Sequence, residues 1–364
     1  MIAYLALAAW LYLIFAHGKF WQSVPELGAA IPPEYPDVDI IVPARDEACT
    51  IGPVIGSLLA QDYLGKYRVI LVDDDSTDGT AALAGAATNL DIIALTSKPP
   101  EWSGKLWALS QGVGASHAPL ILFTDADIVH DPRHLSSLVA KLLLSPADMV
   151  SEMVRLNCTS LAERALVPAF VYFFQMLYPF ERVNDPSSPV AAAAGGTVLI
   201  RRDALRRSGG MDAIKNALID DVALAKSVKK SGRIFLGHSA LAASIRPYPH
   251  FADIWHMISR TAFTQLRHSA ILLALALLGL TLVWLVPPAA ALLGHGAGRI
   301  CGLMAWGLSA ISYMPTLARY GRNRSWALAL PLIAIFYMAA TCGSALDYWR
   351  GRGARWKSRA YGSG

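Results

Sequence analysis

The stretch Pro119-Leu120-Ile121-Leu122-Phe123-Thr124-Asp125-Ala126-Asp127 decides the fold of this 364-residue chain. Its apolar part, Leu120–Thr124, predicts a buried strand. Asp125 and Asp127 follow it one residue apart, so we expect their side chains to point the same way, because side chains alternate along an extended chain. Paired carboxylates of this kind suit a hard divalent cation, which prefers oxygen ligands and can share phosphate oxygens with them.

Two further acidic clusters accompany this pair. Asp73-Asp74-Asp75 ends the strand predicted at 68–72, and Asp220-Asp221 lies further along the chain. In open α/β sheets, ligands bind at the carboxyl ends of the strands, which is where the first two acidic sites are expected. Three acidic sites in one domain predict chemistry on a nucleotide diphosphate.

Strand and helix signals alternate through the middle of the chain. Strands are predicted at 38–42, 68–72, 92–95 and 120–124, and helices at 47–61, 78–87 and 105–116. This alternation, with continuous apolar strands, argues for an α/β fold whose mainly parallel sheet is covered on both faces. We place this domain at residues 37–268.

The composition is unusually apolar for a soluble protein, with 54% hydrophobic and 16% charged residues. The apolar excess lies at residues 1–16 and 270–346. Residues 1–17 have neither a basic start nor a clear small-residue cleavage site, so they predict a retained membrane anchor rather than a cleaved signal peptide. The run is short for a complete span, which leaves an interfacial position open.

The C-terminal region, 270–346, predicts about three transmembrane helices. They are Ala270–Leu293, Cys301–Ala318 and Trp326–Leu346. Pro287-Pro288 would kink or end the first of them. Suppose that all three helices cross the membrane and that the domain is cytoplasmic. The arginines between the last two helices then lie on the cytoplasmic side, as the positive-inside tendency prefers. The basic tail at 347–364 lies on the opposite side, which this tendency disfavours. It therefore stays open whether one segment is re-entrant or interfacial.

Two other segments carry membrane signals. The basic tail lies beside an apolar segment, which indicates contact with anionic lipid headgroups rather than with nucleic acid. Residues 165–180 are apolar and aromatic but too short to span comfortably. They fit equally well a helix at the membrane interface, or lining an acceptor tunnel, and a plain core helix.

The second strong motif is Val72-Asp73-Asp74-Asp75-Ser76-Thr77-Asp78-Gly79-Thr80. It resembles the Asp-Asp-x-Ser-x-Asp-Gly-Thr motif of family 2 glycosyltransferases, which have the GT-A (Rossmann-like) fold. Five other motifs agree in order and spacing: Ile41–Glu47, Gly104-Lys105 with Ala108-Leu109 and Gly112, Asp125-Ala126-Asp127, Gly195-Gly196-Thr197 with Ile200-Arg201-Arg202, and Ile219-Asp220-Asp221 with Leu224. The resemblance covers roughly residues 38–270. It is strongest to the hopanoid-biosynthesis-associated glycosyltransferases of bacteria, with ceramide glucosyltransferases as more distant relatives.

The resemblance implies inverting transfer of a sugar from a UDP-sugar to a membrane lipid such as a hopanoid. Asp221, preceded by Asp220, would be the general base that takes the proton of the acceptor hydroxyl in a single displacement. Asp127, helped by Asp125, would hold Mg²⁺ or Mn²⁺ on the diphosphate and neutralise charge on the leaving UDP. The residues expected to bind the nucleotide sugar are Pro43, Arg45, Glu47, Asp73, Asp74, Lys105, Asp125, Arg260, Gln265 and Arg267.

Several of these assignments have structural alternatives. Asp73 and Asp74, expected on the uracil and ribose, could instead cap a turn. Lys105, expected near the diphosphate, could be a solvated helix lysine. Asp220 and Asp221 precede a helical run, so they could cap that helix, and this role is compatible with catalysis.

The chain departs from the family pattern in one place. Many membrane-bound relatives carry Gln-x-x-Arg-Trp before the next membrane helix. Here either Gln265 or Arg267 aligns with that motif, but not both, and the Trp is absent, which puts a processive polymer synthase in doubt. Arg260 and Arg267 are two helical turns apart, on one predicted helix face, where they would hold either the diphosphate or lipid headgroups.

Together these expectations describe a multi-pass protein of the bacterial inner (plasma) membrane with a cytoplasmic catalytic domain. Its partners would be a UDP-sugar, a lipid acceptor and the bilayer, and not nucleic acid. Two alternatives are transfer to polyprenyl phosphate and a non-catalytic membrane scaffold that binds nucleotide or lipid. The presence of both Asp127 and Asp221 argues against the scaffold, because a non-catalytic relative has no physical need for both.

Overall fold

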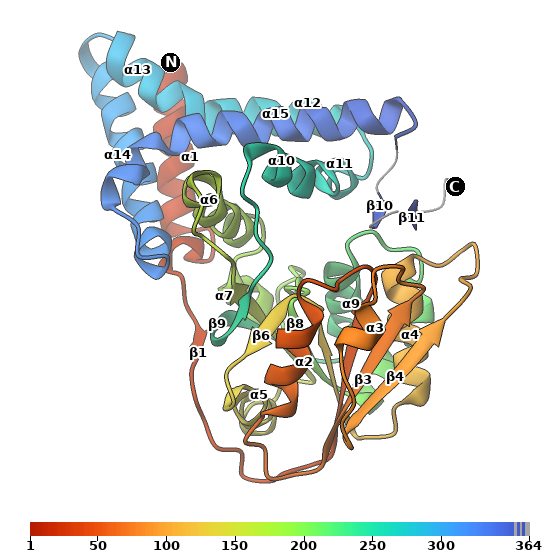
Figure 1. Ribbon diagram of the computed structural model, residues 1–364. Helices are drawn as coiled ribbons and strands as arrows, with labels where there is room; N and C mark the ends of the chain where they lie inside the picture. Colours follow the sequence, from red (N-terminus) through yellow and green to blue (C-terminus); the bar gives the residue numbers. More distant parts are fainter. Residues whose placement is uncertain (353–354, 357–358, 361–364) are drawn as a thin grey trace. The chain divides into compact units, whose positions relative to one another are not determined.

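The computed structural model describes residues 1–352, 355–356 and 359–360 (Figure 1). Its chain divides into two compact units. The sheet unit consists of Val24–Asn157, Arg182–Pro247 and the chain from Arg355 onward, and the helical unit consists of Met1–Ser23, Cys158–Glu181 and Tyr248–Ala354. The domain predicted at 37–268 does not coincide with this division, because the helices within 158–181 and 248–268 pack in the helical unit.

The sheet unit is built on one sheet of nine strands in the order β1-β9-β7-β8-β5-β2-β3-β4, with β6 paired to β9. The strands are β1 Glu26–Leu27, β2 Val38–Ala44, β3 Tyr67–Asp74, β4 Leu90–Leu95, β5 Leu120–Thr124, β6 Ile128–His130, β7 Met149–Arg155, β8 Thr197–Arg201 and β9 Ile234–Ser244, and a separate pair is formed by β10 Arg355–Trp356 and β11 Arg359–Ala360. Most pairs are parallel, including β2 with β3 and β5. β8 runs antiparallel between β5 and β7. The predicted α/β fold with a mainly parallel sheet is confirmed.

Helices cover both faces of this sheet. They are α2 Ile51–Leu59, α3 Thr80–Leu83, α4 Gly104–Ala115, α5 His134–Leu144, α7 Phe180–Asn184, α8 Arg202–Arg207, η2 Asp212–Ile214 and α9 Asp220–Lys229. Ile40 and Val42 of β2 share a buried apolar cluster with residues of α2 and α5. Ile41 points to the opposite face, where it lies against Gly112 of α4.

Two helices are shorter than predicted. α2 begins at Ile51 rather than at residue 47, and α3 covers four residues rather than 78–87. For α2 the cause lies in the loop that precedes it. The backbone N–H of Glu47 donates to Thr80 Oγ1 at 2.8 Å, and the N–H of Ala48 donates to Asp78 Oδ2 at 2.9 Å. These side-chain bonds replace the first turn of the helix predicted at 47–61. The α3 helix is shortened mainly at its end, beyond which Gly85 takes a left-handed φ of 77°.

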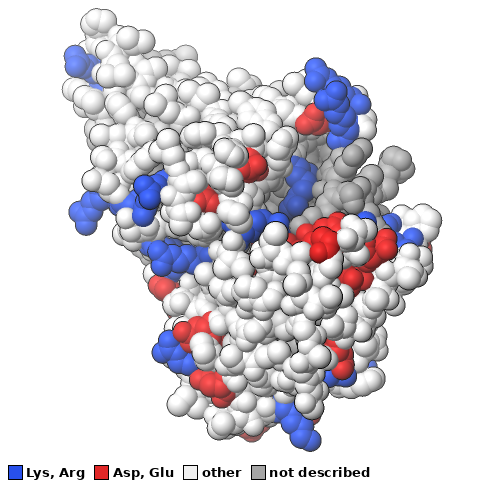
Figure 2. Space-filling model, viewed as in Figure 1, with Lys and Arg blue, Asp and Glu red and all other residues white. Residues whose placement is uncertain are grey.

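The helical unit contains the apolar segments. Its helices are α1 Ile2–Phe15, η1 Phe20–Gln22, α6 Leu161–Leu177, α10 Phe251–Ser259, α11 Ala262–Gln265, α12 Ala270–Leu280, η3 Thr281–Leu285, α13 Val286–Leu293, α14 Gly296–Arg319, η4 Arg324–Ala329 and α15 Leu330–Trp349. Three stretches are long and apolar enough to cross a membrane: Ala270–Leu293, Gly296–Arg319 and Arg324–Trp349. They correspond to the three predicted spans. On the face shown in Figure 2, few charged side chains interrupt the surface of α12–α15.

The first of these stretches passes through Pro287-Pro288 without ending. α12 is followed by η3, a π-helical segment, and α13 then starts with proline in its first turn. Proline has no N–H to donate, and a local π turn accommodates the missing hydrogen bond while the helix continues. The prolines therefore change the helix type instead of terminating the span.

α1 and α6 form part of the interior of the helical unit. Trp10 of α1 is fully buried and donates its Nε1–H to the carbonyl of Val283 at 2.8 Å. α6, the segment predicted at 165–180, starts with a capping box formed by Ser160 and Glu163. Its Tyr172 is fully buried, and the hydroxyl oxygen of Tyr172 lies 2.6 Å from Ser312 Oγ. Contact of either helix with lipid stays a prediction.

The basic tail predicted at 347–364 is described only in part. α15 ends at Trp349, and Arg350 and Arg352 follow it. The side chains of the later basic residues lie outside the described residues. The proposed contact of this tail with lipid headgroups stays a prediction.

Candidate active site

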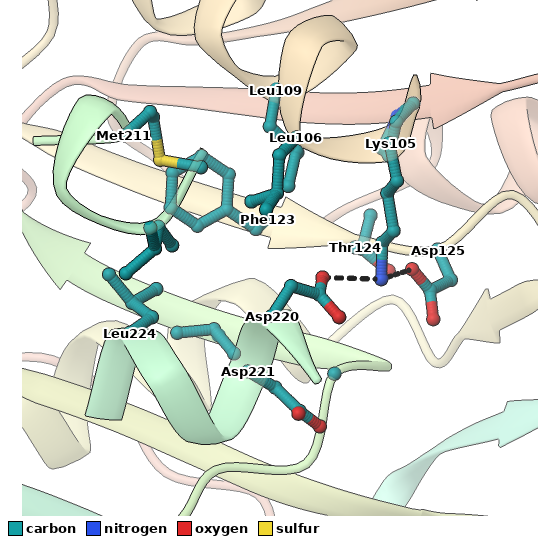
Figure 3. A pocket seen from close by; sticks show the side chains of 14 residues that line it. Lys105, Leu106, Leu109, Phe123, Thr124, Asp125, Met211, Asp220, Asp221 and Leu224 are labelled. Atoms are coloured by element: carbon teal, nitrogen blue, oxygen red, sulfur yellow. Dashed lines mark ion pairs between the residues drawn. The ribbon is translucent and has the colours of Figure 1, made fainter. Parts of the chain in front are cut away.

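A pocket in the sheet unit opens where β2 and β5 end. Its empty volume is about 360 Å³, and apolar side chains from α4, β5 and α9 form much of its wall (Figure 3). The lining residues are Pro43, Lys105, Leu106, Leu109, Phe123, Thr124, Asp125, Gly195, Val198, Met211, Ile214, Asp220, Asp221 and Leu224. Five predicted site residues, Pro43, Lys105, Asp125, Asp220 and Asp221, therefore meet here, although they span 179 positions of the chain (221 − 43 + 1).

Lys105 joins two of the acidic clusters. It lies in the first turn of α4, where Ser103 caps the helix by accepting from the N–H of Leu106 at 3.3 Å. Its Nζ lies 2.9 Å from Asp125 Oδ1 and 2.9 Å from Asp220 Oδ2, as Figure 3 shows. Burial acts to lower the pKa of Lys105, but the two carboxylates outweigh it and raise the pKa well above the ordinary value. Lys105 is therefore a charged bridge and not a solvated helix lysine.

Asp221 is a half-buried carboxyl in the first turn of α9. Its Oδ1 accepts from the N–H of Val222 at 2.7 Å, but the N-cap position is Ile219 and has no side-chain cap bond, so the two aspartates lie within the first turn and do not cap the helix from before it. Burial, followed by the negative charge of Asp220, raises the pKa of Asp221 to about 7. A Cβ added at Gly195 would lie 3.2 Å from Asp221 Oδ2, so the backbone passes close to this carboxyl. A carboxyl with this pKa is suited to accept a proton near neutral pH.

Asp127 is held by an arginine that the sequence analysis did not single out. Arg246 Nε lies 2.6 Å from Asp127 Oδ2, and its Nη2 lies 2.6 Å from Glu47 Oε1. β6 pairs with β9 so that Ile128 faces Ser244, which brings Arg246, two residues further on, beside Asp127. No motif marks this arginine. Two buried acids require a cation, but the sequence does not say which residue supplies it.

The predicted nucleotide residues Asp73 and Asp74 lie at the end of β3, and Arg45 directly follows β2. Asp74 is fully buried, and its Oδ2 lies 3.7 Å from Arg45 Nη1, which also donates to the Asp74 carbonyl. Asp73 accepts a hydrogen bond from Ser76 Oγ, so the predicted turn-capping alternative is present. Asp75 takes a left-handed φ of 58° in this turn. Contact of Asp73, Asp74 and Arg45 with a nucleotide stays a prediction.

Arg260, Gln265 and Arg267 belong to the helical unit, and their role in donor binding stays a prediction. The single helix face predicted for the two arginines is wrong. α10 ends at Ser259, α11 covers only Ala262–Gln265, and Arg267 has a left-handed φ of 53°. Ser344 of α15 contacts the chain at this break, where its Oγ donates to the Ser259 carbonyl and accepts from the N–H of Phe263.

Comparison with known proteins identifies the domain that carries this pocket. Residues 39–209 match the family described as Glycosyl transferase family 2. This segment, just under half of the chain, is similar to a family 2 glycosyltransferase domain. The match indicates a transferase and confirms the family-level resemblance seen in the sequence, while the hopanoid subfamily stays a prediction.

Two curated relatives match part of this chain. Dodecaprenyl-phosphate galacturonate synthase of Rhizobium johnstonii is 27% identical over 129 residues, which are 35% of this chain and 38% of that protein. 4,4'-Diaponeurosporenoate glycosyltransferase of Staphylococcus aureus is 38% identical over 91 residues, which are 24% of this chain and 23% of that protein. The chain thus matches well under half the length of either relative.

A solved structure shares the fold over nearly the whole chain. A mannosyltransferase from Pyrobaculum calidifontis, in complex with GDP-Man and Mn²⁺, superposes with a TM-score of 0.58. The two sequences are 20% identical, and the match covers 95% of this chain and 98% of that one. Together with the family match, this likeness confirms the GT-A fold.

The glycosyltransferase domain offers donor atoms that fit Mg²⁺ or Mn²⁺. Both ions prefer oxygen, and Asp125 and Asp127 provide carboxylate oxygens at the end of β5. Among the residues that the structure describes, no group of three or more His, Cys, Asp or Glu side chains is spaced to hold an ion. An ion held here by Asp125 and Asp127 would therefore need further oxygens from the donor diphosphate.

The charge balance around the pocket also favours such an ion. Five acids face two bases: Glu47, Asp125, Asp127, Asp220 and Asp221 against Lys105 and Arg246. A diphosphate brings further negative charge, and like charges in a partly buried site repel strongly. A divalent cation removes this repulsion, so the site suits a metal–diphosphate complex better than a free diphosphate.

Proposed function

We propose that this protein transfers a sugar from a UDP-sugar to a membrane lipid, with inversion at the anomeric carbon. The observation that carries the proposal is Asp221, a half-buried carboxyl of the pocket whose pKa is raised to about 7 and which directly follows Asp220, a partner of Lys105. An acceptor hydroxyl needs a base of this kind, because its own proton is not lost at neutral pH. The family 2 domain and the apolar helices supply the context.

The reaction proposed for this pocket is a single displacement. Asp221 takes the proton of the acceptor hydroxyl while that oxygen bonds to the anomeric carbon. The bond from this carbon to the diphosphate breaks, and UDP leaves with the electron pair. Mg²⁺ or Mn²⁺, held by Asp127 and Asp125, would neutralise charge on the leaving group when bound. Lys105 adds a fixed positive charge in the pocket.

A lipid acceptor is proposed because of the helical unit. Three helices are long and apolar enough to cross a membrane. A site tethered to a membrane meets an amphiphile more readily than a dilute soluble sugar. Both curated relatives are named for acceptors of a lipid kind, a dodecaprenyl phosphate and a diaponeurosporenoate. We propose the inner membrane of a bacterium as the location, with the sheet unit in the cytoplasm and a hopanoid as one acceptor.

The role proposed for Asp221 as a general base bears on the class of acceptor. A phosphate acceptor is already ionised at neutral pH and needs no general base, whereas an alcohol does. Transfer to polyprenyl phosphate, suggested by the Rhizobium relative, would therefore not require Asp221 to act as a base. We favour a hydroxyl acceptor for this reason.

The test is UDP release by purified protein in detergent, with Mn²⁺ or Mg²⁺, a panel of UDP-sugars and either a bacterial lipid extract or polyprenyl phosphate. Release that needs lipid and metal, and is lost in Asp221→Asn and Asp127→Ala, supports the proposal. Asp185→Asn is the matched control, because Asp185 is exposed and its carboxylate accepts from the hydroxyl of Ser187, two residues away. Release with polyprenyl phosphate alone that survives Asp221→Asn would favour the alternative acceptor. Metal-dependent UDP binding without turnover would favour the scaffold.

A further inference from the structure

Arg246 lies where a divalent cation would have to bind. Its guanidinium contacts Asp127 and Glu47 at 2.6 Å each, and the side chains of these two acids are 12% and 10% exposed. Ion pairs shielded from water in this way are stronger than pairs on an open surface. Burial acts to lower the pKa of Arg246, but the two acids raise it above the ordinary value, so the guanidinium stays charged.

The backbone of Arg246 is fixed, while its side chain is free to change partners. The N–H of Ile245 donates to the Asp127 carbonyl at 2.9 Å, directly continuing the β6–β9 pairing. The arginine Cα therefore cannot leave the site without breaking the sheet. Its long side chain is 30% exposed and can rotate without disturbing that pairing.

Each acid of the Asp-x-Asp pair already forms an ion pair with a basic side chain of the protein. Lys105 binds Asp125, and Arg246 binds Asp127. A metal ion must take an oxygen from this arrangement, and it would then lie beside a guanidinium of the same sign. A nucleotide diphosphate relieves that repulsion, because its oxygens can accept hydrogen bonds from a displaced guanidinium.

We propose that Arg246 is a competing cation at the metal site. It neutralises Asp127 while the donor is absent, and it gives up that ion pair when Mg²⁺ or Mn²⁺ arrives with the nucleotide diphosphate. This exchange couples metal binding to donor binding, and the coupling acts equally in both directions. The inference rests on the proposed function, because it assumes that Asp127 holds the metal. Arg246 is accordingly a positioning residue and not a catalytic one.

The test measures Mn²⁺ binding to full-length protein in detergent, from the electron paramagnetic resonance signal of free Mn²⁺, with and without UDP. In the wild type, UDP should tighten Mn²⁺ binding at least tenfold. In Arg246→Gln, Mn²⁺ alone should bind at least tenfold more tightly than in the wild type, and the effect of UDP should shrink. Arg246→Lys should lie between them, because an ammonium keeps the charge but reaches only one carboxylate. Arg133→Gln is the control, since Arg133 is exposed and pairs with Asp131.

Each outcome decides a different point. Mn²⁺ binding that is equal or weaker in folded Arg246→Gln overturns the role of Arg246 and leaves the proposed function standing. If Arg246→Gln does not fold, Arg246→Lys decides, and wild-type affinity in that variant overturns the inference. Failure of every variant to bind Mn²⁺ in the presence of UDP overturns the inference and the metal-dependent function together. Loss of Mn²⁺ binding in Asp127→Asn confirms that the measured Mn²⁺ binds at the Asp127 carboxylate.

Discussion

At the scale of single residues, the carboxyls of the pocket differ in their partners. Asp125 and Asp220 share the ammonium of Lys105, while Asp221 is bonded to a backbone N–H. Burial and the neighbouring Asp220 disfavour charge on Asp221 and raise its pKa to about 7. A group that titrates near neutral pH makes the rate of the proposed reaction depend on pH in the physiological range.

The first prediction concerns this dependence. A general base works only when deprotonated, so the rate should rise with pH and reach half its maximum near pH 7. Asp221→Asn should lower kcat by about 10²–10⁴-fold and leave donor KM nearly unchanged, because only the proton transfer is lost. UDP release measured between pH 5.5 and 8.5 checks both statements. A flat profile in the wild type would contradict the assignment of Asp221 as the base.

A second residue-scale feature is a buried chain of polar side chains beneath the end of β5. Glu152 Oε2 lies 2.7 Å from His134 Nε2, His134 Nδ1 lies 2.9 Å from His130 Nδ1, and His130 Nε2 lies 3.1 Å from Thr124 Oγ1. All four side chains are buried. Buried polar groups are costly unless they are paired, so the chain must stay intact for the sheet unit to fold.

We therefore predict that His134→Leu destabilises the protein by about 3–5 kcal/mol, because it leaves the buried Glu152 carboxyl without this partner. Thermal unfolding in detergent, followed by intrinsic fluorescence, measures the change. His117→Leu is the control, because His117 is exposed, and it should change stability by less than about 0.5 kcal/mol. Equal losses in the two variants would show that the chain of side chains does not contribute in this way.

At the scale of elements, α4 is the helix that connects packing to the pocket. It carries Lys105 at its start and packs its middle on β2, where a Cβ at Gly112 would lie 2.4 Å from Ile41 Cγ2. Such a distance is too short for two carbon atoms, so the helix can lie this close to the sheet only because residue 112 is glycine. The position of Lys105 therefore depends on a contact two turns away along the helix.

Gly112→Ala should consequently destabilise the protein by about 1–3 kcal/mol through overpacking, and it should weaken donor binding by shifting Lys105. Gly114 lies in the same helix with no atom within 4 Å of an added Cβ. Gly114→Ala should instead raise stability by about 0.5–1 kcal/mol, because alanine favours helix over glycine. Thermal unfolding and UDP binding of both variants test the pair. A stable Gly112→Ala protein would mean that α4 can move without cost.

At the scale of the whole molecule, exposed apolar side chains are concentrated in the helices of the helical unit. Leu275 and Leu278 of α12 are 59% and 68% exposed. In the most apolar 18-residue segment of the stretch Ala270–Leu293, only 17% is buried within the protein. Exposure of this kind is costly in water and favourable in lipid.

The last prediction is that the protein stays in the membrane pellet after extraction with alkaline carbonate. Leu278→Arg should reduce the inserted fraction, because an arginine near the centre of a span costs about 2.5–3.5 kcal/mol. Leu64→Arg is the matched control, since Leu64 is 80% exposed in the sheet unit and should not affect insertion. Release of the wild type into the supernatant would contradict membrane spanning by these helices.

The sequence by itself determined the parts of the protein that depend on neighbouring residues. Apolar runs ending in acids predicted β3 and β5 with Asp73 and Asp125 at their carboxyl ends, and three long apolar stretches predicted the candidate spans. These features follow from local periodicity and local hydrophobicity, which the chain order records directly. The family motifs added the expectation that these separated acids serve one site.

Only the tertiary structure decided which residues meet. The β6–β9 register brought Arg246 to Asp127, and the position of α4 brought Lys105 between Asp125 and Asp220. The contact of Ser344 with the Ser259 carbonyl and the Phe263 N–H accompanies the break in the helix that spacing had predicted through Arg267. The physical reason is the same in each case. Strand register and helix packing are fixed by contacts between residues far apart in the chain, and no local pattern encodes which distant partner will complete an ion pair or a hydrogen bond.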